Sequence, residues 1–169
     1  TMPLVQAAEP AAAATPNTRK TPALRAKVYE QLARAQALAD AGKTAEALAA
    51  LDNVREKSSS MNSYELAMMH NFYGFIAYNA EQYDKAITAF TEVVAQDGIP
   101  ETLELSTLFS LAQLHMMQGN YEKTLTFIDR WEKLNKAPIK ASTFLLKAQA
   151  MYQLKDYQRA SGFINQAVT

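Results

Sequence analysis

Apolar and small residues recur three and four positions apart through most of the chain, and this spacing predicts amphipathic α-helices. The stretch after Thr21 contains no helix breaker before Gly42. Pro22 suits the first turn of a helix and Thr21 can cap it, so the first helix is expected to begin there. A second helix is predicted from about Thr44 to Lys57, where a run of three serines follows.

A third helix is predicted to begin near Asn62. Glu65 stands three residues later, which is the spacing of a capping box. At 100° per residue, one arc of this helix contains His70, Tyr73, Gly74 and Ala77. We expect this arc to face a partner helix, and Gly74 to let the two backbones approach closely because it has no Cβ.

The same arrangement recurs along the chain with offsets of 39, 38 and 36 residues. The residues that open the second helix of each pair are Thr44, Tyr83, Tyr121 and Tyr157. About ten positions earlier stand the small residues Ala35, Gly74, Ala112 and Ala148. Three positions after the opening residue stand Ala47, Ala86, Thr124 and Ala160. Four further on stand the bulky residues Leu51, Phe90, Ile128 and Ile164.

This pattern resembles the tetratricopeptide repeat family, whose signature is W-x2-L-G-x2-Y, then A-x3-F, then P. Tyr73-Gly74 and Ala86-x3-Phe90 match the signature best. The resemblance implies an all-α fold, a right-handed superhelical solenoid of about four antiparallel helix hairpins. The periods exceed the 34 residues of the family, so longer connections between hairpins are expected. Pro100 and Pro138 are expected to begin helices after two of them.

The expected organisation is a disordered tail followed by four repeats, over residues 1–21, 22–60, 61–99, 100–137 and 138–169. The tail is rich in Ala and Pro and has few large apolar residues. In it, Val5-Gln6-Ala7 fits the small-x-small rule for signal-peptide cleavage, with a plain linker as the alternative. The first repeat is degenerate. Because the last helix is apolar and a solenoid needs a polar end, we expect the native protein to continue past residue 169.

Composition excludes several classes of protein. Lys plus Arg equals Asp plus Glu at 17 each, so no net field attracts nucleic acid, and no nucleic-acid partner is expected. The chain has no cysteine, which removes thiolate catalysis, disulfides and sulfur-ligated metals. No apolar run approaches the roughly 18 residues of a membrane-spanning helix, so direct membrane insertion is not expected.

Candidate chemistry is sparse. His70 and His115 both fall on positions that pack a hairpin, and neither belongs to an H-E-x-x-H motif. The five glycines form no phosphate-binding cluster, and no G-x-S-x-G motif is present. We therefore predict no catalytic residue, no cofactor and no metal site, and we do not expect an enzyme unless a further domain supplies the chemistry.

In the tetratricopeptide family the first helices of the hairpins line a concave groove, so the resemblance implies that a protein or peptide partner binds there. The residues opposite the packing arcs are the predicted partner-binding set: Tyr29, Leu32, Gln36, Met68, Asn71, Phe75, Tyr78, Asn79, Phe109, Gln113, Met116, Met117, Leu145, Gln149, Tyr152 and Gln153. The set contains no Lys or Arg, so the basic clamp of chaperone-binding members is absent. For Phe75, Phe109 and Met116, packing between adjacent repeats is the alternative.

The favoured function is a noncatalytic scaffold of a Gram-negative envelope, exported to the periplasm, that binds a partner helix or extended segment. The tail and long-period repeats are also similar to proteins described as accessory components of TonB-type systems. No cysteine follows the cleavage position, which disfavours a lipid anchor. The alternatives are a cytoplasmic adaptor or secretion chaperone, and the repeat region of a larger enzyme. Self-association is left open.

Overall fold

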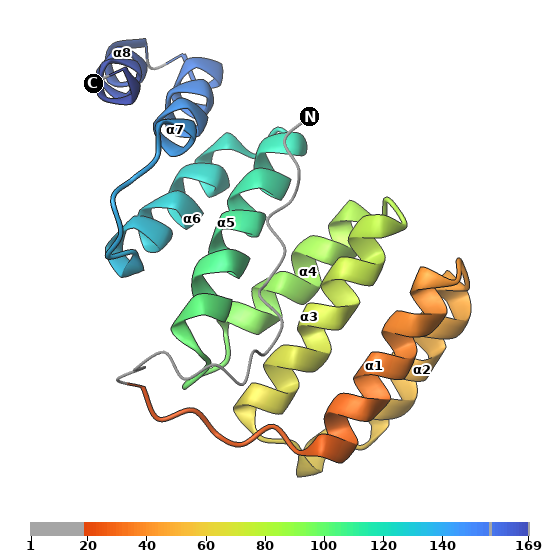
Figure 1. Ribbon diagram of the computed structural model, residues 1–169. Coiled ribbons are helices and arrows are strands. Elements are labelled where there is room, and N and C mark those ends of the chain that lie inside the picture. The colour runs from red at the N-terminus through yellow and green to blue at the C-terminus, as the bar shows by residue number, and fades with distance from the viewer. Residues whose placement is uncertain (1–18, 156, 169) are drawn as a thin grey trace. The chain divides into compact units, whose positions relative to one another are not determined.

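Eight α-helices and one short 3-10 helix make up the described part of the chain, residues 19–155 and 157–168 of the computed structural model (Figure 1). No strand occurs in these two ranges. The helices are α1 (Ala26–Asp40), α2 (Thr44–Glu56), the 3-10 helix η1 (Ser58–Ser60), α3 (Ser63–Asn79), α4 (Tyr83–Val94), α5 (Glu101–Met117), α6 (Tyr121–Leu134), α7 (Ala141–Gln153) and α8 (Tyr157–Ala167).

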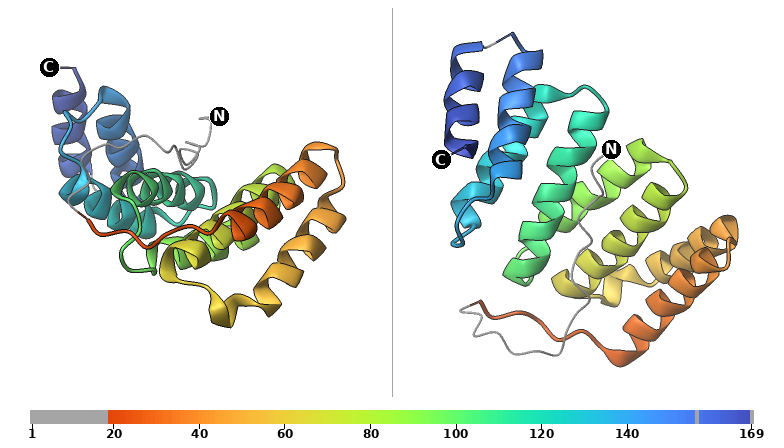
Figure 2. Two further views of the ribbon diagram at one scale, coloured as in Figure 1. Left: turned by 60° about the horizontal axis from the view of Figure 1, so that its bottom comes forward. Right: turned by 45° about the horizontal axis from the view of Figure 1, so that its top comes forward.

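Consecutive helices pair into antiparallel hairpins, α1 with α2, α3 with α4, α5 with α6 and α7 with α8, as the two views of Figure 2 show. Three residues connect the helices of each hairpin and six connect one hairpin to the next. The predicted all-α fold of about four hairpins is confirmed, as are the long connections. The described residues form two compact units, 19–107 and 108–168. The superhelix expected for all four hairpins together stays a prediction.

The turn inside each hairpin has one repeated geometry. Gly42, Glu81, Gly119 and Lys155 all have positive φ, between 59° and 78°. In the first three turns, the residue with positive φ donates its N–H to the carbonyl three residues earlier. The residue after it donates its N–H to the carbonyl five residues earlier, as Gln82 does to Ala77. These bonds form the Schellman motif, which satisfies carbonyl groups at a helix end. The residues are spaced by the same offsets that the sequence predicts, so the register of the repeat is confirmed.

Small residues set the distance between α3 and α4 in the unit of residues 19–107. Gly74 is buried against Phe90, and a Cβ built on Gly74 would lie closer than 3.0 Å to three carbon atoms of that ring. Ala86 and Phe90 are fully buried, and the Phe75 ring meets the Phe90 ring edge-on with centroids 5.0 Å apart. The expected close approach is confirmed, and the Phe90 ring lies directly on the glycine.

The unit of residues 108–168 repeats this packing with one change. Ala112, Ile128 and Leu146 form one buried cluster, as the register predicts for the first two. In the last hairpin Ile164 is 46% exposed, whereas its counterparts are fully buried. Phe163, one position earlier, packs on the core there. The predicted equivalence of Ile164 with Phe90 and Ile128 is therefore wrong.

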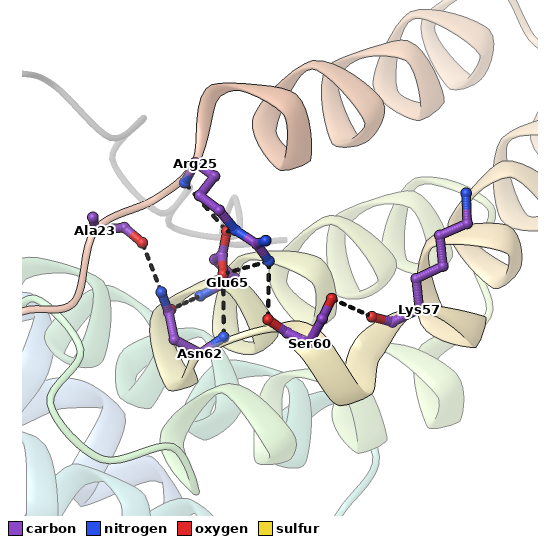
Figure 3. Close-up of polar contacts among 6 residues, drawn as sticks. All are labelled: Ala23, Arg25, Lys57, Ser60, Asn62 and Glu65. Atoms are coloured by element: carbon purple, nitrogen blue, oxygen red, sulfur yellow. Dashed lines mark hydrogen bonds and ion pairs between the residues drawn. The ribbon is translucent and has the colours of Figure 1, made fainter.

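The start of the first helix differs from the prediction. Thr21 and Pro22 lie in an extended segment, and α1 begins at Ala26. The Arg25 guanidinium holds both carboxylate oxygens of Glu65, with Nε to Oε2 at 2.9 Å and Nη2 to Oε1 at 3.1 Å (Figure 3). Arg19 similarly pairs with Glu104 at 2.6 Å. These contacts reach 40 and 85 residues along the chain, so no local helix signal shows them.

The predicted capping box is present at the start of α3. The Asn62 side chain accepts from the Glu65 N–H at 2.9 Å, and Glu65 Oε1 accepts from the Asn62 N–H at 3.1 Å. Pro100 directly precedes α5, as expected, and its carbonyl accepts from the Glu104 N–H. Pro138 does not begin a helix, because residues 138–140 have no regular secondary structure and α7 begins only at Ala141. Residues 1–18, with the predicted cleavage site, lie outside the described residues.

Glu65 makes the stability of the protein sensitive to acid. Its side chain is 1% exposed, and although burial acts to raise its pKa, the hydrogen bonds from Arg25 and Asn62 lower the pKa below its usual value. A lowered folded-state pKa stabilises the fold above the unfolded value of about 4.3, and this stabilisation is lost as the pH falls through the folded value. We expect Glu65→Gln to lower the free energy of unfolding by about 1 kcal/mol at pH 7. The stability of this variant should also fall less steeply than that of the wild type as the pH is lowered.

The control is Glu46→Gln, since Glu46 lies exposed in the first turn of α2. Urea unfolding at several pH values between 7 and 3 measures the free energy of unfolding of both variants. Parallel pH profiles for Glu65→Gln and the wild type would contradict this role of the carboxylate.

Candidate functional site

The first helices α1 and α3 carry eight of the predicted partner-binding residues. On α1, Tyr29 and Gln36 are partly exposed, and Gln36 Nε2 donates to Asp40 Oδ1 at 2.8 Å. Leu32 is fully buried with Val28 and Ala35, which lie about one turn of the helix before and after it. Leu32 therefore belongs to the core of its unit and offers no surface to a partner.

On α3 the predicted residues differ in exposure. Met68 is buried, Phe75 and Tyr78 are partly exposed and Asn79 is exposed. Phe75 packs on Phe90, as described above, and the Tyr78 ring lies 5.7 Å from the Tyr83 ring. The Phe75 and Tyr78 rings thus help to join α3 to α4, and each keeps part of its surface exposed.

Asn71 is the most unusual polar residue on α3. Its side chain is 7% exposed, and Oδ1 is buried without a hydrogen-bond partner among the described residues. A buried amide oxygen that lacks a donor costs about 1 to 3 kcal/mol. Because this oxygen is buried, Asn71 belongs to the interior of its unit and does not offer its acceptor to a partner.

The unit of residues 108–168 contains the other eight predicted residues, of which four lie on α5. Gln113 is buried, and Phe109 and Met116 are partly buried against the cluster around Ala112. The Phe109 ring lies 5.4 Å from the Trp131 ring of α6. Phe109 and Met116 thus pack against a cluster that includes Leu146 of the next hairpin, all within the unit of residues 108–168. Met117, at the end of α5, is 49% exposed.

Helix α7 presents the largest exposed set. All four of its predicted residues are exposed, with Leu145 at 49% and Tyr152 at 60%. The spacing of Leu145, Gln149 and Tyr152 is four and three residues, so they share one face of the helix. The other face is buried through Thr143, Leu146, Lys147, Ala150 and Met151. The exposed face of α7, defined by Leu145, Gln149, Tyr152 and Gln153, is thus an apolar stripe with two amides.

Both histidines lie close to aromatic rings. The His115 ring is buried and stacks on the Phe127 ring of α6 at 5.4 Å, and burial followed by the nearby Lys123 lowers its pKa. Its predicted hairpin-packing role is confirmed. His70 lies 6.4 Å from the Tyr73 ring, and burial lowers its pKa as well. Among the described residues no three His, Cys, Asp or Glu side chains are placed to hold a metal ion.

Comparison with known families agrees with the hairpin geometry. A family model described as "Tetratricopeptide repeat" matches residues 32–98. A second, described as "Anaphase-promoting complex, cyclosome, subunit 3", matches residues 79–167, more than half of the chain. The chain belongs to the tetratricopeptide repeat family. Neither model describes a TonB-type system, and no curated protein matches the chain.

Tetratricopeptide repeats serve as scaffolds for interactions between proteins, and this chain is a scaffold of that class. The repeats that the two models match are typical of noncatalytic proteins. Within the described ranges, no helix has the length and apolar character that crossing a membrane requires.

Two features of these tetratricopeptide repeats were missed from the sequence. The first is an ion pair from Lys147 Nζ of α7 to Glu132 Oε1 of α6, at 2.8 Å, with the Lys147 side chain only 9% exposed. The second is a cavity at α2, α3 and α4, beside Tyr73. A lysine on a helix normally indicates a solvated face, and no motif marks either feature.

Proposed function

We propose that this tetratricopeptide protein is a noncatalytic scaffold that holds a helix or extended segment of a partner protein on the exposed faces of its first helices. One observation carries the proposal. The described residues include five exposed large hydrophobic side chains, and three of them, Met117, Leu145 and Tyr152, lie on the first helices α5 and α7. Leu145 and Tyr152 lie on one face of α7, and large apolar side chains that are exposed together commonly mark an interaction site.

The chemistry of these faces suits a polypeptide. Leu145 and Tyr152 supply apolar anchors, and an amide such as Gln149 between them can bond to peptide groups. None of the predicted residues is basic, and the neighbouring Lys147 is engaged by Glu132. Binding through a carboxylate clamp is therefore not proposed.

Leu145→Ser and Tyr152→Ser together are expected to reduce capture of the partner by at least tenfold, because buried aromatic and aliphatic anchors dominate interface energies. The matched control is Ile164→Ser on the second helix α8, where Ile164 is 46% exposed in the same hairpin. Partner retention is measured on immobilised full-length protein with circular dichroism as the folding check. Equal losses for both changes, or none for the first, would contradict the proposal.

We also propose that the protein is exported to the periplasm of a Gram-negative cell and there assists an envelope assembly, such as a TonB-type system. Val5-Gln6-Ala7 and the Ala/Pro-rich tail support export. The matched model described as a complex subunit accords with a role inside an assembly. Fractionation of cells that express the full reading frame tests the location. Recovery in the cytoplasm would favour an adaptor or secretion chaperone.

A further inference from the structure

A cavity of about 620 Å³ lies in the unit of residues 19–107. Its lining comes from Leu48, Asp52 and Arg55 of α2, from His70, Tyr73 and Ala77 of α3, and from Asp84, Lys85, Thr88, Ala89 and Glu92 of α4. None of these belongs to the predicted partner-binding set. The volume is in the range of sites that bind small ligands or short peptide segments.

The floor of the cavity is mainly apolar. Tyr73, Ala77 and Ala89 are each at most 8% exposed, and Leu48 and His70 are partly buried. The Tyr73 hydroxyl donates to Asp52 Oδ1. Burial and this bond raise the Tyr73 pKa, so the ring stays uncharged, and burial lowers the His70 pKa, which favours a neutral imidazole at pH 7. An aliphatic side chain can therefore enter without meeting a charge on the floor.

The rim is charged and has more carboxylates than cations. The Arg55 guanidinium lies over the Tyr73 ring, 4.4 Å from the centroid, and Nη2 is 3.9 Å from Asp52 Oδ1. Arg55 and Asp52 thus offset each other. On the α4 side, Asp84 and Glu92 are exposed and have no ion-pair partner in the described part of the chain. Lys85 is the single lining cation beside them.

We propose that this cavity is a second binding site, for a segment of a partner protein that carries an aliphatic side chain and, about one helical turn away, an arginine or lysine. The aliphatic side chain fills the floor, and the cation pairs with the carboxylate of Asp84 or of Glu92 at the rim. Arg55 shows that a guanidinium can lie over the floor beside a carboxylate, since it covers the Tyr73 ring next to Asp52. The site goes beyond the function proposed above, since it uses the second helices α2 and α4.

The test uses the peptide acetyl-Leu-Ala-Ala-Arg-amide and, as its control, the same peptide with Glu in place of Arg. Amide chemical shifts of the isotope-labelled 169-residue chain are followed in titrations at low and high salt. We expect saturable shifts along α2 and α4 with the Arg peptide and at least fivefold weaker binding of the Glu peptide. The double change Asp84→Asn and Glu92→Gln should weaken binding of the Arg peptide several-fold. Added salt should also weaken its binding.

A matched pair of variants locates the site. Thr88 and Thr91 are both exposed on α4 and each donates its hydroxyl to the carbonyl four residues back, but only Thr88 lines the cavity. Thr88→Trp should abolish binding of the Arg peptide and Thr91→Trp should leave it unchanged. Absent shifts, shifts confined to the first helices, or equal effects of the two tryptophans would overturn the proposal. Leu145→Ser with Tyr152→Ser should not affect this peptide, so the two proposals fail separately.

Discussion

Replacement of Gly74 by alanine is expected to destabilise the protein by about 1 to 3 kcal/mol, even though alanine is the better helix former. The added methyl group would overlap the Phe90 ring, which is fully buried and held by Phe75. The ring cannot move without disturbing its own neighbours, so the overlap outweighs the gain of about 1 kcal/mol in helix propensity. Gly74→Leu should be more damaging still. Urea unfolding followed by circular dichroism measures the change.

Gly162 provides the matched control, because it lies within α8 and a Cβ added there meets nothing within 4 Å. Gly162→Ala should therefore stabilise the protein by about 0.5 to 1 kcal/mol. In addition, Gly74→Ala combined with Phe90→Leu should cost less than the sum of the two single changes, since the smaller side chain relieves the overlap. Equal stabilisation by alanine at both glycines would show that the α3 and α4 contact is not close.

Removal of the Glu132 carboxylate is the second change with a large expected effect. Lys147 is buried, and its ammonium has Glu132 at 2.8 Å and the Phe163 ring at 4.1 Å from its centroid. Glu132→Ala leaves that ammonium without a counter-charge, which we expect to cost about 2 to 3 kcal/mol. The value is below that of a fully buried pair because the Glu132 side chain is 22% exposed.

Lys147→Met tests the same ion pair from the other side. Methionine retains the apolar stem and a favourable contact with the Phe163 ring, but it leaves the Glu132 carboxylate, whose Oε1 is buried, without its cation. We therefore expect this variant to lose about 1 to 3 kcal/mol, less than Glu132→Ala, because the Glu132 side chain is 22% exposed and that of Lys147 only 9%. The denaturant midpoints of the two variants compare their stabilities, provided that the free energy of unfolding depends on denaturant with the same slope in both. A larger loss for Lys147→Met than for Glu132→Ala would contradict the assigned energetics.

The hairpins could be predicted because their signals are local and repeated. Small residues at Ala35, Gly74 and Ala112, with bulky residues about sixteen positions later, fix both the helix pairs and their register. The turns show how far such a signal reaches. Gly42 and Gly119 indicate a left-handed residue directly, while Glu81 and Lys155 take the same conformation only because the hairpin geometry imposes it.

Contacts between distant residues could not be predicted in this way. The beginning of α1 depends on Arg25 and Glu65, and the buried Lys147 depends on Glu132, so neither can be inferred from one helix alone. The exposed face of α3 is likewise not marked by a local pattern. Residues buried on this helix include Met68, Met69 and Asn71 as well as those facing α4, because α1, α2 and α4 all contact it. A helix enclosed in this way has no single apolar stripe.

The central claim is that a partner polypeptide lies on the first helices, and site-specific photo-crosslinking tests it most directly. A benzophenone amino acid is placed at Tyr152 of α7 in one protein and at Ile164 of α8 in another, since both side chains are largely exposed in the same hairpin. We predict that the Tyr152 position crosslinks to a discrete partner segment and that the Ile164 position does not. Equal crosslinking at both positions, or crosslinking only at Ile164, would contradict the account.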